Sequence, residues 1–172
     1  MKPSELKEGD YNEYFKTYID KLANTSELLP TLIKQLQNFP NFMTSIPQEK
    51  LQYAYAPEKW TILEALQHII DTERIFQYRA FRISRNDKTP LQGFDQDAFV
   101  PESGANAKSI AEMVEEYKTV RASTISLFAS LDDSILKRVG TASNSPMSVG
   151  AIGFIICGHQ RHHRDIIRER YL

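Results

Sequence analysis

The sequence predicts an all-helical protein built as a four-helix bundle. Apolar residues recur at steps of three and four over several long segments, which is the period of a helix with one buried face. The 172 residues include only seven glycines, and no alternating apolar and polar run is long enough to indicate a strand. At this length one domain is expected, residues 1–172, and a composition of 41% hydrophobic residues is enough for a sizeable core.

The first long helix is expected to begin near Ser26, after an extension (residues 1–25) that packs on the bundle through a short helix or turn at 11–23. Pro30 then lies in the first turn, where proline is tolerated. Pro40 should kink this helix or end it early. The apolar residues of this helix repeat as in a bundle: Leu29, Leu32, Leu36, Phe39, Met43 and Ile46.

The second helix has the clearest start in the chain. Thr61 is a good N-cap, and Glu64 three residues later completes a capping box. The helix should run to about Arg85, with His68 in its second turn on a face of mixed polarity. That face suits a residue at the edge of the core that lines a cleft. Its core face is Leu63, Leu66, Ile69, Ile70 and Phe76.

Residues 86–106 contain turn formers and no helical periodicity. A loop of this length is uncommon in a compact domain and is often functional. One interpretation is a lid over the cleft that carries Phe94, Asp95, Asp97 and Phe99. The other is a long crossover between two bundle helices that run parallel, and the two interpretations are compatible.

A third helix is expected over 107–131, followed by a connection at 134–146. The fourth should run from Met147 or Ser148 to about Tyr171, and its first half is apolar nearly all round. Because each helix of a bundle keeps one outer face, we expect a partner to cover this one, which indicates a homodimer through helix four. The residues opposite its histidines are Gly150, Phe154 and Cys157.

His159 and His163 lie four residues apart, and so on one face of the fourth helix. At ~100° per residue, that face is also its apolar stripe. Burying two imidazoles there is costly unless their nitrogens find partners, either one shared metal ion or a hydrogen-bonded polar pocket. His68 from the second helix would complete a three-ligand catalytic site. His162 lies ~60° to the other side of His159, so it is either a substitute ligand or, as we expect, a residue at the rim.

The overall composition excludes several classes of function. A formal net charge of −1 argues against nucleic acid as the main partner. A single cysteine excludes an internal disulfide framework and fits a reducing cytosol. The N-terminus lacks the apolar core of a signal peptide, and no apolar run approaches membrane-spanning length. We therefore expect a soluble cytoplasmic protein with no membrane partner.

Three segments carry a family resemblance: APEKWTILEALQHIIDTERIFQYRAFRISRND, KTPLQGFDQDAFV and VGAIGFIICGHQRHHRDIIRERYL. From about residue 25 to the end, the chain resembles the DinB superfamily, in particular its YfiT-like metal-dependent hydrolases. The resemblance implies a bundle with up-down-down-up connectivity. It also implies a divalent metal, zinc or nickel, on His68, His159 and His163, and often a dimer. Some relatives are transferases or isomerases that use low-molecular-weight thiols.

These observations favour a metal-dependent enzyme that acts on a small molecule. The ion would activate either water for hydrolysis or a low-molecular-weight thiol for transfer. Asp71 could orient His68 from behind or be plain solvated surface. Asp71, Asp95 and Asp97 are base candidates by position only. Two other classes remain open: a non-catalytic metal- or ligand-binding protein of a stress response, and a structural dimer with core histidines.

Overall fold

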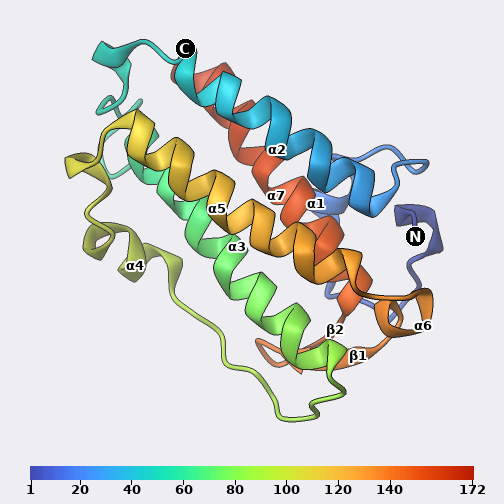
Figure 1. The fold of residues 1–172 in the computed structure, drawn as a ribbon. Helices are drawn as coiled ribbons and strands as arrows, with labels where there is room; N and C mark the ends of the chain where they lie inside the picture. Colours follow the sequence, from blue (N-terminus) through green and yellow to red (C-terminus); the bar gives the residue numbers. More distant parts are fainter.

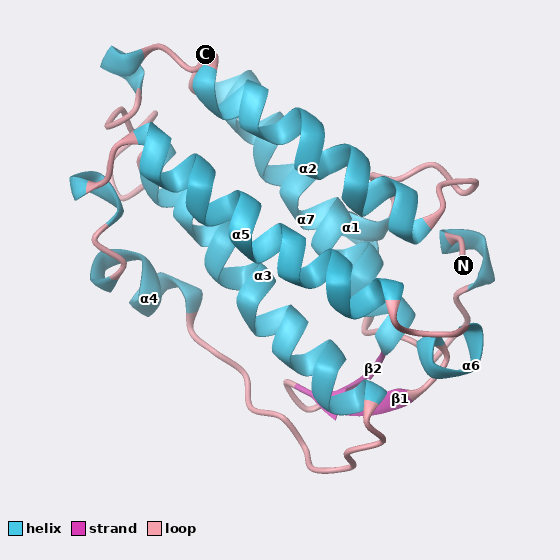
Figure 2. Cartoon of the chain, viewed as in Figure 1, coloured by secondary structure: helices cyan, strands magenta, loops and turns pink.

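Four long helices form a bundle in the computed structural model, which describes residues 1–172 (Figure 1). Helix α3 packs on both α5 and α7, and α2 packs on the same two neighbours. The fold is therefore mostly helical, as predicted (Figure 2). The long helices are α2 (Leu28–Thr44), α3 (Ile62–Ser84), α5 (Ile110–Ala129) and α7 (Val149–Arg170).

Short elements connect the long helices. The short α-helices are α1 (Lys16–Ile19), α4 (Gln96–Glu102) and α6 (Asp133–Leu136). Single 3-10 turns lie at Pro3–Glu5, Glu13–Phe15, Gln48–Lys50 and Ala105–Ala107. No helix is both long and apolar enough to span a membrane.

Side-chain caps set where the long helices begin. The Thr61 hydroxyl accepts a hydrogen bond from the Glu64 amide, and the Glu64 carboxylate accepts one from the Thr61 amide, so the predicted capping box at α3 is confirmed. Ser109 forms a second capping box at α5. Ser148 caps α7, where the sequence placed its start. Each cap satisfies amide groups that the first turn of a helix leaves without partners.

Helix α2 continues past Pro40 to Thr44, so the expected early end is wrong. Proline removes one backbone donor and normally destabilises a helix interior. Here Phe39 and Met43 on either side are buried in the core, and their packing outweighs that loss. The Thr44 hydroxyl also donates to the Pro40 carbonyl oxygen.

A small β-hairpin precedes α7 and was not predicted. Strand β1 (Val139–Ala142) pairs antiparallel with β2 (Ser145–Ser148). Ser143 and Asn144 form the two-residue turn with φ of 51° and 59°, the left-handed values that such hairpin turns need. Four-residue strands are too short for periodicity to reveal them. Helix α4, with seven residues and an internal proline, escaped prediction for the same reason.

The apolar core falls into two clusters along the bundle. One contains the C-terminal half of α3, the first half of α7 and parts of the N-terminal segment. The other contains the first half of α3, most of the buried face of α5 and the end of α7. Along α7, His159 and Gln160 lie between the two clusters, and both are buried. Two buried polar side chains of α7 therefore lie near the middle of the bundle.

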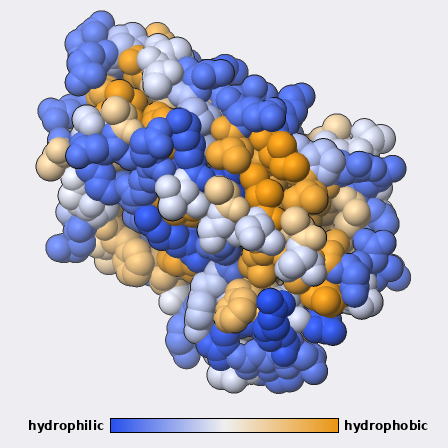
Figure 3. Space-filling model, viewed as in Figure 1, coloured by the Kyte–Doolittle hydropathy of each residue, from blue (hydrophilic) through white to orange (hydrophobic).

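The outer side of α7 is covered within the chain itself. A Cβ atom added at Gly158 would lie 2.0 Å from the carbonyl oxygen of Tyr18, and one added at Gly150 would lie 2.3 Å from the sulfur of Met1. Phe154 and Cys157 are fully buried. Residues of the N-terminal segment therefore cover part of this face, and the homodimer expected through helix four stays a prediction. Figure 3 shows hydrophilic residues over much of one outer face, with apolar ones gathered over α2 and the adjoining end of α5.

Candidate metal centre

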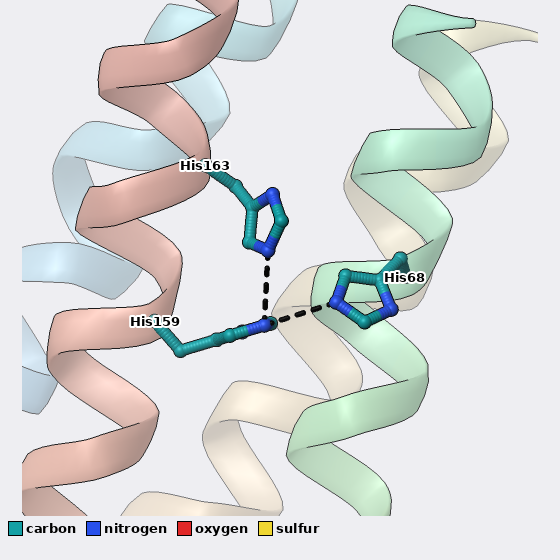
Figure 4. A group of neighbouring side chains, drawn as sticks. All are labelled: His68, His159 and His163. Carbon is teal, nitrogen blue, oxygen red and sulfur yellow. Dashed lines mark hydrogen bonds between the residues drawn. The ribbon is translucent and has the colours of Figure 1, made fainter. Parts of the chain in front are cut away.

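Three imidazole rings from two neighbouring helices converge in the middle of the bundle (Figure 4). His68 points inward from α3, and His159 and His163 point toward it from successive turns of α7. The Nε2 atom of His159 lies 3.0 Å from that of His68 and 3.1 Å from that of His163. The structure thus brings together the three histidines that the sequence singled out.

All three rings are held in the neutral form. Burial is the main cause: together with the neighbouring His162, it lowers the pKa of His68 to about 4. Burial followed by the other cluster histidines lowers the pKa of His159 well below the usual value, and His163 behaves in the same way. Neutral imidazole is the form that binds a metal ion.

The geometry of the cluster fits one divalent ion. Each neutral ring has a single N–H, and the one in-plane lone pair of His159 Nε2 cannot serve both neighbours well. A cation between the rings would satisfy all three nitrogens. Tetrahedral zinc bonds imidazole at about 2.0–2.1 Å, which sets ligand nitrogens about 3.3 Å apart. The two Nε2 separations that involve His159, 3.0 and 3.1 Å, are close to that value, and the ligand atoms of all three rings lie within 4.8 Å of one another.

Thr72, and not Asp71, lies next to the Nδ1 atom of His68. The Thr72 hydroxyl lies 3.4 Å from His68 Nδ1. The Asp71 carboxylate accepts hydrogen bonds from Gln67 and Arg74 instead, on another side of the helix. Of the two alternatives for Asp71, orienting His68 or lying at the solvated surface, these contacts do not support the first. One residue along a helix is a rotation of about 100°, which is enough to turn a side chain away from the cluster.

Two cavities flank the histidines. The larger, about 410 Å³, is lined by His159 and Thr72 and extends along α3 to Arg79. The smaller, about 220 Å³, is lined by His163 and Trp60. The cluster therefore lies between two spaces that a small molecule could enter, which suits a site for a small substrate.

The long segment at 86–106 contributes to both cavities. Phe94 lines the larger one and Asp97 the smaller one. Asp95 has another role: its carboxylate caps α4 by accepting from two backbone amides. The side chain of Phe99 is 49% exposed and lines neither cavity. Of the three aspartates considered as bases, only Asp97 has a carboxylate that makes no hydrogen bond and lines a cavity with a cluster histidine.

Two aromatic residues beside the cluster were missed from the sequence. The Tyr18 ring lies 5.2 Å from that of His159 and also contacts His162, which is half-buried at the rim as expected. The Trp60 ring lies 4.7 Å from that of His68. Trp60 is the only tryptophan and directly precedes the capping box, so the sequence could have indicated it as a candidate site residue. Tyr18 had none, because it reaches the site only through packing of the N-terminal segment.

Comparisons with known proteins agree with this architecture. The sequence profile of the DinB superfamily matches residues 31–167. A solved structure of YfiT from Bacillus subtilis, described as "a probable metal-dependent hydrolase with an unusual four-helix bundle topology", superimposes with a TM-score of 0.71. That match covers 96% of this chain and 90% of the other at 15% sequence identity, so it shows a shared fold. No curated protein sequence matched.

Proposed function

The chain belongs to the DinB superfamily, and from that premise we propose that it is a metal-dependent hydrolase. One divalent ion, zinc or nickel, would be held by His68, His159 and His163. The observation that carries the proposal is the convergence of three neutral imidazoles, two of them buried and His163 half-buried. The description of YfiT as a probable metal-dependent hydrolase supports the same class of reaction.

When bound, the ion would act as a Lewis acid that activates water for hydrolysis. The chain's own residues would do the remaining work. Asp97 is the proton acceptor that we assign, because its carboxylate lines the cavity that contains His163. Thr72 would keep the His68 ring in place through Nδ1. Tyr18 and Trp60 would limit access of bulk water from either side.

We also propose one domain over 1–172 with helices in up-down-down-up order. In Figure 1 the chain runs in the same direction along α3 and α5, and in the opposite direction along α2 and α7. The 86–106 segment is long enough to connect two parallel helices, which a short turn cannot do. A homodimer and a cytoplasmic location remain predictions.

The metal is tested by elemental analysis of protein purified without an affinity tag or chelator. The proposal requires about one divalent ion per chain. His159→Ala should abolish it, because it removes the central ligand. His162→Ala is the matched control, since this neighbouring ring is half-buried but outside the cluster, and should leave the metal content unchanged. Absence of metal from folded wild-type protein would leave only a structural role for the histidines.

Turnover is tested on the metal-loaded protein with a panel of small activated esters and amides, each with and without an added low-molecular-weight thiol. Hydrolysis without thiol supports the proposal, whereas strict dependence on thiol would identify a transferase. Asp97→Asn should lower kcat by about 10²–10⁴-fold, the usual contribution of a general base, with no loss of metal. Bound metal without turnover on any substrate would point to a non-catalytic binding protein.

A further inference from the structure

Arg79 is a buried cation without an acidic partner. Only 2% of the residue is exposed. Its Nη2 donates to the carbonyl oxygen of Gln92 and to the hydroxyl of Ser143, both at 2.9 Å. An arginine has five N–H groups, so using two leaves three with no acceptor on the protein. No carboxylate lies within 4 Å, and no acidic group raises its pKa, which burial lowers.

The other buried arginine of the bundle has the acidic partner that Arg79 lacks. Arg121 is fully buried and meets the Glu73 carboxylate through two hydrogen bonds of 2.7 and 2.8 Å. A buried charge without such a partner is expensive, and arginine cannot lose its proton to avoid the expense. The N–H groups of Arg79 that lack a protein partner are not enclosed by protein atoms, so the guanidinium can receive an anion in the cavity that it lines.

Three parts of the fold hold the Arg79 guanidinium in one position. Helix α3 supplies the residue, the 86–106 segment supplies the Gln92 carbonyl, and the hairpin turn supplies Ser143. Phe76 and Phe94 lie near the guanidinium carbon, at 5.1 and 5.9 Å from it to their ring centroids. A guanidinium fixed in this way is pre-organised to receive a ligand.

Arg79 and the histidine cluster share one cavity. The lining of the 410 Å³ cavity includes both Arg79 and His159. Arg79 follows His68 by eleven residues on α3, a rotation of only ~20° after three turns, so both lie on the same helix face roughly 16 Å apart along the axis. Because Arg79 packs on Phe76, one turn earlier, its side chain leans back toward the cluster. A small molecule in this space would meet the histidines at one end and the guanidinium at the other.

The walls between these ends are mainly aromatic. Phe15, Phe76 and Tyr18 lie along the cavity, and Phe94 covers it from the 86–106 segment. Such walls bury apolar groups of a ligand. We propose that the substrate is a small molecule with an apolar or aromatic middle and an anionic oxygen group, a carboxylate or phosphate, that binds Arg79. Its role as substrate rests on the proposed function, whereas the anion site stands on Arg79 alone.

Calorimetric titration of metal-free protein tests the anion site. Without a metal ion, the cavity holds no strong anion-binding group other than Arg79. The probes are 3-phenylpropionate, its uncharged amide 3-phenylpropionamide, and phenyl phosphate. The carboxylate or the phosphate should bind at least tenfold more tightly than the amide. Which of the two binds better distinguishes a carboxylate substrate from a phosphate ester.

Arg79→Met should reduce that preference to less than threefold. Arg79→Gln gives the same test if methionine disturbs folding, since a neutral amide can still donate to Gln92 and Ser143. Arg85→Met is the matched control, because this exposed arginine at the end of α3 lies outside the cavity, and should keep the preference. Equal binding of acid and amide by the wild type, or an unchanged preference in a folded Arg79 variant, would overturn the proposal.

Repeating the titration on His159→Ala separates the two proposals. Removal of the central imidazole should abolish metal uptake but leave the acid-over-amide preference within threefold of the wild type. A wild-type protein that binds no metal yet prefers the acid would refute the proposed enzyme and retain the anion site. A wild-type protein that binds metal but shows no preference for the acid would refute the anion site and retain the proposed enzyme.

Discussion

Replacing Glu73 by glutamine should cost about 3–5 kcal/mol of unfolding free energy. Arg121 and Glu73 form a two-pronged ion pair, at 2.7 and 2.8 Å, whose side chains are 0% and 2% exposed. Glutamine has the same shape but no charge, and its amide group would face the guanidinium. The substitution therefore leaves a buried charge uncompensated and removes an acceptor. For a domain of ordinary stability, about 5–15 kcal/mol, this is a fifth or more of the total.

Urea denaturation followed by circular dichroism measures this cost, provided that the dependence on denaturant concentration is unchanged. Glu115→Gln on α5 is the control, since its ion pair with Lys118 is exposed, with side chains 73% and 45% accessible. An exposed pair contributes about 0–1 kcal/mol, so this variant should unfold close to the wild type.

A double substitution separates the loss of a favourable pair from the cost of a stranded charge. Glu73→Met with Arg121→Met removes both charges and fills similar volume, so it should be more stable than Glu73→Gln alone. The half-buried Gln35, which accepts from Arg121 Nη1, would lose that bond, so recovery need not be complete. A Glu73→Gln cost below about 1 kcal/mol, or a double variant less stable than the single one, would refute this reasoning.

Two further predictions concern packing and pH. Gly158→Ala should destabilise by about 1–3 kcal/mol in thermal unfolding, because its Cβ would lie 2.0 Å from the Tyr18 carbonyl oxygen; Gly93→Ala, with no atom nearer than 3.5 Å, should be close to neutral. Burial raises the pKa of Glu116, but hydrogen bonds from neighbouring cationic and amide groups outweigh it and lower the pKa to about 2. The wild type should thus be more stable than Glu116→Gln above pH 5, by about 1 kcal/mol for this partly exposed group, and lose that advantage as the pH falls toward 2; a constant difference in unfolding free energy across this range would contradict the assignment.

Much of the fold and the histidine site could be predicted from local patterns. The capping box at Thr61 marked where α3 begins, because a cap acts on amides within three residues of itself. The start of α7 was placed at Met147 or Ser148, and Ser148 caps it. The four-residue spacing of His159 and His163 placed both rings on one face for the same local reason. The hairpin and α4 are too short to carry a period, and both were missed.

The sequence by itself therefore determined the helices, their faces and the candidate ligands, since these depend on residues a few positions apart. Only the tertiary structure decided which helix faces meet. It placed Thr72 rather than Asp71 behind His68, covered α7 with the chain's own N-terminal segment, and left Arg79 without an acidic partner. Contacts of this kind join residues distant in the chain, and packing of the whole bundle selects them.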